Sequence, residues 1–210
     1  STGRQIAINR WHFNSWGQKY PWEKDNEVGD KIARESKLAW FDPKIVLEGG
    51  AIDVNGRGTC LTTSSCLLNT NRNGGLSAEK MGEYLKSYLG IENVIWLDGA
   101  LKGDDTDGHV DNLARFVNPT TIVYISEDDK NDENYLGLKG IEETLKKASD
   151  CDGKPFAVIP LPMPRAIEYK NFRFPASYAN FYIGNNVVLV PAFNDPNDMV
   201  AQEILKTCFP

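Results

Sequence analysis

The sequence has few of the features that mark membrane proteins and nucleic-acid-binding proteins. No apolar run in its 210 residues approaches the roughly 20 residues that a membrane-spanning helix needs. No cluster of Lys and Arg stands out, and the formal net charge is −6, which argues against nucleic acid and anionic membranes as partners. The N-terminal residues do not have the pattern of a signal peptide. We therefore expect a cytoplasmic protein that binds neither membrane nor nucleic acid.

Cysteine and histidine are also scarce. The four cysteines have no Cys-x-x-Cys spacing, and with only two histidines they make a poor zinc set, so we expect no metal. We interpret the cysteines as reduced thiols. A Walker loop, a Rossmann fingerprint and a Gly-x-Ser-x-Gly elbow are absent as well. Nucleotide binding and serine hydrolysis therefore lack support.

The predicted elements repeat along the chain. The length of 210 residues suffices for one sizeable core and requires no second domain. Two units have the order strand, strand, helix, strand, and a third lacks the last strand. The first unit is predicted at 51–54, 59–63, 77–89 and 93–97, and the second at 109–117, 121–126, 133–148 and 156–161. The third is predicted at 178–183, 187–191 and 195–207. Such recurrence indicates an α/β repeat architecture in which each unit buries a face against the next. The missing strand predicts that the chain is a fragment, or that part of the protein is supplied elsewhere.

Local signals define some of these elements further. The dipeptide Asn55-Gly56 between two apolar runs predicts a hairpin. Ahead of the repeats, alternating apolar and polar residues from Gln5 to Phe13 predict a strand. Near-helical spacing from Asp25 to Trp40 predicts a helix with Asp25 as its N-cap.

The stretch Gly108-His-Val-Asp111 carries the first candidate site residues. In an extended segment the side chains of His109 and Asp111 point the same way, and that of Val110 points to the opposite face. An imidazole and a carboxylate on one face can hold a cation and move a proton. A polar loop in which His109 caps a strand is the competing interpretation, and local composition alone favours it.

Two other features add to this candidate site. Glu48 ends the apolar run 45–47 and precedes two glycines, and a buried carboxylate needs a partner. A salt bridge to Lys or Arg is the simpler explanation for Glu48. The segment 11–17 contains Trp11 and Trp16, whose faces can line a pocket for a cation, although core packing is the commoner role of such residues.

These segments together resemble the agmatine deiminase family, which groups with the bacterial, Porphyromonas-type peptidylarginine deiminases. The resemblance covers nearly the whole chain in the right order. It rests on Trp-His-Phe-Asn-Ser-Trp-Gly at 11–17, Leu-Glu-Gly-Gly at 47–50, Gly-Thr-Cys-Leu-Thr-Thr at 58–63, Asn-Arg-Asn at 71–73, Asp-Gly-His-Val-Asp-Asn at 107–112, Pro-Leu-Pro-Met-Pro at 160–164 and Pro-Ala-Phe-Asn-Asp-Pro at 191–196. It implies a pentein α/β-propeller of ββαβ units, in which residues 1–210 are part of a single domain that lacks N- and C-terminal segments and contains about three of five units.

The resemblance also implies a reaction, the hydrolysis of agmatine to N-carbamoylputrescine and ammonia in putrescine biosynthesis, without metal or organic cofactor. A cysteine thiolate attacks the guanidinium carbon, and a histidine protonates the leaving ammonia and then activates water. Carried over by motif, His109 is the general acid and base, Asp111 grips the guanidinium, and Glu48 is the second acidic residue of the centre. The predicted substrate-binding residues are Trp11, Trp16 and Asp107.

Two motifs of the family do not occur in these residues. They are Arg-Asp-x-Gly-Pro, with a further guanidinium-binding aspartate, and Gly-Gly-x-x-His-Cys, with the nucleophile. None of the four cysteines present takes the place of the family's nucleophilic cysteine, so we expect the chain alone to be inactive. A peptidylarginine deiminase and a non-catalytic guanidine-binding or interaction module remain as alternatives. A homo-oligomer is also left open, and exposed sheet edges of an incomplete propeller predict self-association.

Overall fold

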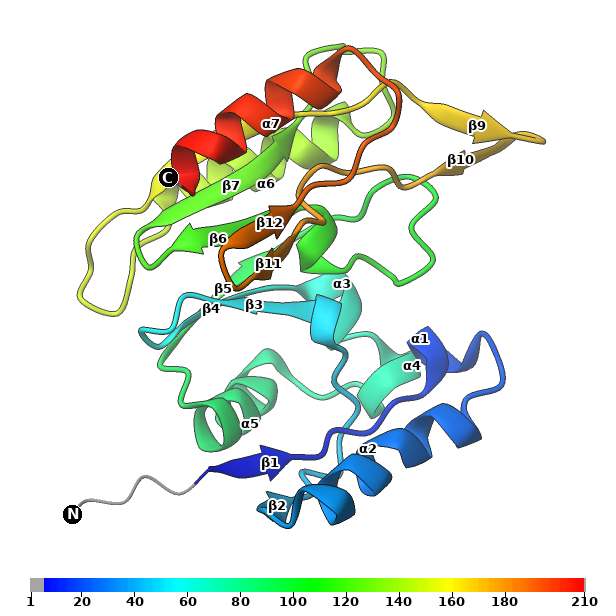
Figure 1. Ribbon diagram of the computed structural model, residues 1–210, viewed down its shortest axis with the longest axis vertical. Helices are drawn as coiled ribbons and strands as arrows, with labels where there is room; N and C mark the ends of the chain where they lie inside the picture. Colours follow the sequence, from blue (N-terminus) through cyan, green and yellow to red (C-terminus); the bar gives the residue numbers. More distant parts are fainter. Residues whose placement is uncertain (1–5, 210) are drawn as a thin grey trace.

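A three-stranded sheet with one helical crossover forms the first half of the mixed α/β fold (Figure 1). The structure is a computed structural model that describes residues 6–209, so Gln5 of the first predicted strand lies outside it. Strand β3 (Ile52–Val54) pairs antiparallel with β4 (Thr59–Thr63), which pairs parallel with β5 (Asn93–Leu97). Helix α5 (Ala78–Leu89) connects β4 to β5, as the parallel pairing requires. The predicted order of this unit is confirmed.

The second sheet repeats this topology. Strand β6 (Ala114–Asn118) is antiparallel to β7 (Thr121–Ser126), and β8 (Ala157–Pro162) is parallel to β7 after helix α6 (Tyr135–Lys147). The strand predicted at 109–117 is wrong in its first part, because those residues form a 3-10 turn before β6 begins. The side chains of both sheets meet in one apolar cluster, which includes buried residues of β4 and of β7.

Local side-chain hydrogen bonds stabilise the hairpin and the helix of the first unit. In the hairpin, Asn55 Oδ1 accepts hydrogen bonds from the backbone N–H groups of Arg57 at 2.8 Å and Thr59 at 3.0 Å. Gly56 has φ +69°, which most residues avoid. Ser77 caps α5 by accepting from Lys80 N at 3.2 Å.

The third unit is a hairpin followed by a helix, with strands β11 (Tyr182–Gly184) and β12 (Val187–Leu189) before α7 (Asn197–Cys208). A further hairpin, β9 (Ile167–Tyr169) with β10 (Phe172–Phe174), was not predicted. Its tip has the left-handed pair Lys170-Asn171, and this sequence lacks the glycine that usually signals such a turn. The sheets of the described residues are open, with two or three strands each.

The N-terminal prediction is partly wrong. Helix α2 (Glu23–Ser36) starts at Glu23 with Trp22 at the N-cap position, so Asp25 lies inside the first turn. The helix ends where Lys37 turns left-handed, and β2 (Ala39–Phe41) then pairs parallel with β1 (Ala7–Asn9). Strand pairing therefore overrides the helical spacing that extended to Trp40.

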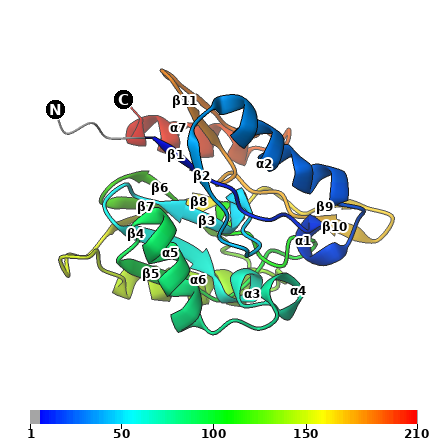
Figure 2. The ribbon, with the colours of Figure 1, turned by 90° about the horizontal axis from the view of Figure 1, so that it is seen from below.

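The remaining elements are short. They are α1 (Ser15–Gln18), η1 (Gly49–Ala51), α3 (Ser64–Leu67), α4 (Thr70–Asn73) and η2 (Val110–Asn112). Helix α2 lies at the opposite end of the molecule from α6 (Figures 1 and 2). No helix among residues 6–209 combines the length and apolarity needed to cross a membrane.

One ion pair links the three units, and it predicts a stability change. Asp53 on β3 accepts from Arg115 Nε at 2.8 Å and from Phe116 N at 2.6 Å, while Arg115 Nη1 donates to Phe181 O at 3.0 Å. We expect Asp53→Ala to lower the free energy of unfolding by about 2 kcal/mol, because it leaves the partly buried Arg115 without its anion and the N–H group of Phe116 without its acceptor. Urea unfolding of the chain measures this loss.

The matched control is Asp152→Ala, since the Asp152 side chain is 76% exposed. We expect this variant to change stability by less than about 0.5 kcal/mol. Equal losses in the two variants would contradict a special role of the Asp53–Arg115 pair.

Candidate active site

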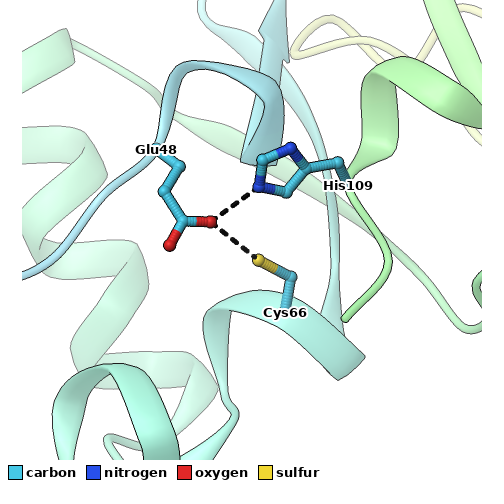
Figure 3. Close-up of side chains that lie close together, drawn as sticks. All are labelled: Glu48, Cys66 and His109. Carbon is cyan, nitrogen blue, oxygen red and sulfur yellow. Dashed lines mark hydrogen bonds and ion pairs between the residues drawn. The ribbon is translucent and has the colours of Figure 1, made fainter. Parts of the chain in front are cut away.

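A buried hydrogen bond joins Glu48 and His109 (Figure 3). The distance from His109 Nε2 to Glu48 Oε2 is 2.6 Å, and the two residues are only 6% (Glu48) and 8% (His109) exposed. Glu48 directly precedes the turn η1, and His109 directly precedes η2. Two backbone turns thus bring together residues that are 61 positions apart in the sequence.

Gly50 makes room for both His109 and Asp111. A Cβ atom at Gly50 would lie 2.4 Å from His109 Nδ1 and 2.7 Å from Asp111 Oδ2, which is far inside contact distance. The imidazole and the carboxylate therefore flank the same glycine. They do so from the 3-10 turn η2 and not from the predicted strand.

Asp111 offers an oxygen to a ligand. Its Oδ1 atom is buried and has no hydrogen-bond partner among residues 6–209. Burial raises the pKa of Asp111, although the electrostatic interactions with His109 and Arg115 act in the opposite direction. A buried carboxylate oxygen without a donor is costly, and a cationic ligand with N–H groups would satisfy it.

Glu48 also has the salt bridge that its position in the sequence suggested. Arg72 on α4 donates from Nε to Glu48 Oε1 at 2.7 Å and from Nη2 to Oε2 at 3.2 Å. Burial opposes ionisation of Glu48, but the hydrogen bonds from His109 and Arg72 outweigh it and lower the pKa of Glu48. Glu48 is therefore an anion that both orients His109 and pairs with Arg72.

Asp107 is engaged by protein side chains. Its carboxylate accepts from Lys19 Nζ at 2.8 Å, from Asn71 Nδ2 at 2.9 Å and from Arg72 Nη1. Burial would raise the pKa of Asp107, but these hydrogen bonds lower it overall. Substrate binding by Asp107 stays a prediction, and its observed contacts hold the loop before His109.

The two tryptophans occupy different surroundings. Trp11 packs edge-on against Tyr88 of α5, with ring centroids 5.6 Å apart. Trp16 packs edge-on between Phe13 at 5.4 Å and Tyr20 at 6.1 Å. Neither set of contacts includes Glu48 or His109, so a pocket role for Trp11 and Trp16 also stays a prediction.

Cys66 completes a cluster with Glu48 and His109 whose ligand atoms all lie within 4.8 Å of one another (Figure 3). The thiol donates to Glu48 Oε2 at 3.8 Å, and burial together with the charge of Glu48 raises the pKa of Cys66 to about 12. A metal ion would require a thiolate and would face the guanidinium of Arg72. This donor set does not fit a metal, and Cys66 is not an activated nucleophile.

The sequence matches one known family over almost its whole length. The model of the Porphyromonas-type peptidyl-arginine deiminase family matches residues 2–210. The chain belongs to this family.

This family member is similar to proteins that are named for agmatine. It is 38% identical over 209 residues to a protein of Legionella pneumophila designated a candidate agmatine deiminase, and the match covers 99% of this chain and 60% of that protein. A C. jejuni agmatine deiminase solved with substrate bound is 40% identical with a TM-score of 0.88, and the match covers all of this chain and 61% of that one. The chain thus spans about 60% of the length of these relatives.

A more distant structure bears on the fold alone. DDAH from Pseudomonas aeruginosa is 14% identical with a TM-score of 0.50, and the match covers all of this chain and 63% of that one. The mixed α/β fold of this family member therefore has pentein-like neighbours.

Arg72 is the site residue that reasoning from the sequence missed. The need of a buried Glu48 for a cation was evident, but several Lys and Arg residues could have met it. Arg72 lies 24 positions away on a helix of four residues, which is too short to show periodicity. Only the motif Asn71-Arg-Asn73 of the family resemblance pointed to this position.

The lowered pKa of Glu48 predicts an acid-sensitive fold. An acid whose folded pKa lies below its ordinary value of 4.5 adds stability above that pH, and this contribution is lost as the pH falls through the folded pKa. We expect the free energy of unfolding to fall on acidification below about pH 4.5, and to fall less steeply in Glu48→Gln. Urea unfolding at a series of pH values measures both slopes.

Glu35→Gln is the control, because Glu35 is exposed. Its slope should match that of the unmodified chain. Parallel slopes in Glu48→Gln and the unmodified chain would contradict a stabilising charge on Glu48.

Proposed function

We propose that the protein hydrolyses the guanidinium group of agmatine to N-carbamoylputrescine and ammonia. The observation that supports this most directly is the Glu48–His109 hydrogen bond beside Asp111, whose Oδ1 atom has no partner among the described residues. The motif with the family's nucleophilic cysteine does not occur in these 210 residues, so the reaction is that of a protein that also includes this motif.

The roles of the residues follow from their surroundings. Ionised Asp111 holds and orients the substrate guanidinium through charge-assisted hydrogen bonds. Because an ionised carboxylate can only accept, His109 donates Nε2–H to Glu48, and its Nδ1 atom faces the space beside Gly50 that it shares with Asp111. Nδ1 is therefore the atom that exchanges protons with the substrate.

The proposed reaction has two steps. The thiol of the nucleophilic cysteine first gives its proton to His109 Nδ1, and the resulting thiolate forms a bond to the guanidinium carbon. The C–N bond then breaks as His109 passes that proton to the departing ammonia. Water then adds to the same carbon, His109 takes a proton from it, and the C–S bond breaks to release the carbamoyl product. No resident metal or cofactor is needed in this scheme.

Repetition supports a further proposal about the architecture. Both three-stranded sheets have the same order, with an antiparallel hairpin, a helix and a parallel third strand. The third hairpin and α7 repeat the beginning of that order. We propose that these are units of a pentein propeller.

Peptidyl-arginine is the alternative substrate, since the matching family model is named for it. The residues 107–112 and the agmatine deiminases among the relatives favour the small amine. A non-catalytic guanidine-binding module is the third candidate. We propose that neither nucleic acid nor a membrane is a partner.

The substrate prediction is tested with protein from the complete open reading frame. We expect ammonia release from agmatine and little from a peptidyl-arginine. Release from the peptide alone would favour the peptidylarginine deiminase. The absence of ammonia release from both substrates would favour the binding module and contradict the proposed hydrolysis.

Substitutions in the same protein test the roles of the residues. We expect His109→Ala to reduce turnover by at least about 100-fold, because it removes the general acid and base. Asp111→Asn should reduce kcat/KM by roughly 100-fold, through the loss of a buried charge pair with the substrate. Ammonia release under steady-state conditions and far-UV circular dichroism measure activity and folding.

Cys66→Ser is the matched control within the same cluster. It should keep turnover within an order of magnitude of the unmodified protein, since the Cys66 thiol is buried and protonated. Loss of activity in Cys66→Ser together with retained activity in His109→Ala would overturn both assignments.

A further inference from the structure

The guanidinium of Arg72 is fully buried and has every donor in use. Its side chain is 1% exposed. Nε donates to Glu48 Oε1, Nη2 donates to Glu48 Oε2 and to Thr106 O at 2.8 Å, and Nη1 donates to Asn71 Oδ1 at 2.8 Å and to Asp107. An arginine has five N–H groups, so none is left over.

These contacts place Arg72 between the two halves of the catalytic pair. One side of the guanidinium holds the carboxylate of Glu48, and the other holds the loop that leads to His109. Within that loop, Thr106 Oγ1 accepts a hydrogen bond from His109 N at 3.1 Å. A single rigid, planar group therefore sets where Glu48 lies relative to the backbone of His109.

We propose that Arg72 is a positioning residue, whose guanidinium fixes Glu48 Oε2 on His109 Nε2 and so keeps the proton of the imidazole on Nε2 and Nδ1 open to the substrate. This proposal rests on the proposed function. It also assigns the orientation of His109 and the binding of the substrate guanidinium to different carboxylates. Both oxygens of Glu48 are already bound by Arg72, so Glu48 has no free pair of oxygens for a second guanidinium. Among the described residues, Asp111 is the carboxylate that remains to bind the guanidinium of the substrate.

A lysine at position 72 cannot take over this role. Its ammonium has three donors from one nitrogen, and it cannot hold both oxygens of Glu48 in the forked geometry while it also reaches Thr106 and Asp107. Arg72→Lys keeps the positive charge and removes the orientation. Arg72→Gln removes both and serves as the second variant.

The test uses the complete protein and two measurements. In steady-state assays with agmatine we expect Arg72→Lys to reduce kcat by about 100-fold, because a misplaced catalytic group costs about that much, while KM changes by less than about threefold. Nitrogen-15 NMR of the histidine rings reports which ring nitrogen carries the proton. His109 should show a fixed Nε2–H form in the unmodified protein and a mixture of forms in Arg72→Lys.

The chain offers good controls for both measurements. The only other histidine is His12, which is hydrogen-bonded through Nε2 to Asp42 Oδ1 at 2.9 Å and whose spectrum should not change. Arg173→Lys alters another buried arginine, one that pairs with Asp132 at 2.8 Å. It should lower stability without changing kcat or the spectrum of His109.

The outcomes separate this proposal from the proposed function. An unchanged kcat or an unchanged His109 spectrum in folded Arg72→Lys would overturn the positioning role and leave a purely structural one. If the unmodified protein releases no ammonia, the proposed function fails, but the spectrum still decides whether Arg72 orients His109. Should Arg72→Gln not fold, Arg72→Lys alone carries the test.

Discussion

The burial of one guanidinium, that of Arg72, organises the site. A buried cation is costly unless acceptors surround it, and these come from segments that are distant in the sequence. Glu48, Thr106 and Asp107 supply them together with Asn71. The N-terminal segment joins at Gly17, where a Cβ atom would lie 2.9 Å from Arg72 Nη1. Satisfying Arg72 thus requires the loop before His109 and the segment that ends at Glu48 to meet, and the aromatic segment lies close to the same guanidinium at Gly17.

The sheets provide the rigid frame on which these loops meet. All five residues of β4 are buried, and η1 and η2 lie where chain segments enter β3 and β6. Asp53 fastens these neighbouring strands to each other through Arg115 and Phe116. Because side chains on well-packed elements hold their positions closely, a distance such as that between Glu48 and His109 can be maintained.

Local chemistry determined which parts of the fold were predictable. The Asn55-Gly56 hairpin and the helix that begins after Ser77 depend on residues close together in the sequence, and both elements were predicted. Strand β2 and the Lys170-Asn171 hairpin were missed, since tertiary pairing decides the first and an atypical turn pair forms the second. For the site, the motifs indicated Glu48, His109 and Asp111, but residue types alone did not reveal that Arg72 is the partner of Glu48. That partnership depends on the path of the loops in three dimensions.

The charges of the site explain why an internal arginine suits a protein that acts on a guanidine. Without Arg72, the imidazole of His109 would lie close to two anions, Glu48 and Asp111, and Glu48 would have no cation beside it in a medium that screens charge poorly. Repulsion between two such carboxylates would also favour protonation of one of them. Arg72 offsets the charge of Glu48, so a cationic substrate meets one available anion, Asp111. Orientation of the histidine and recognition of the substrate are thereby assigned to different carboxylates, and each can be held in the geometry that its own task requires.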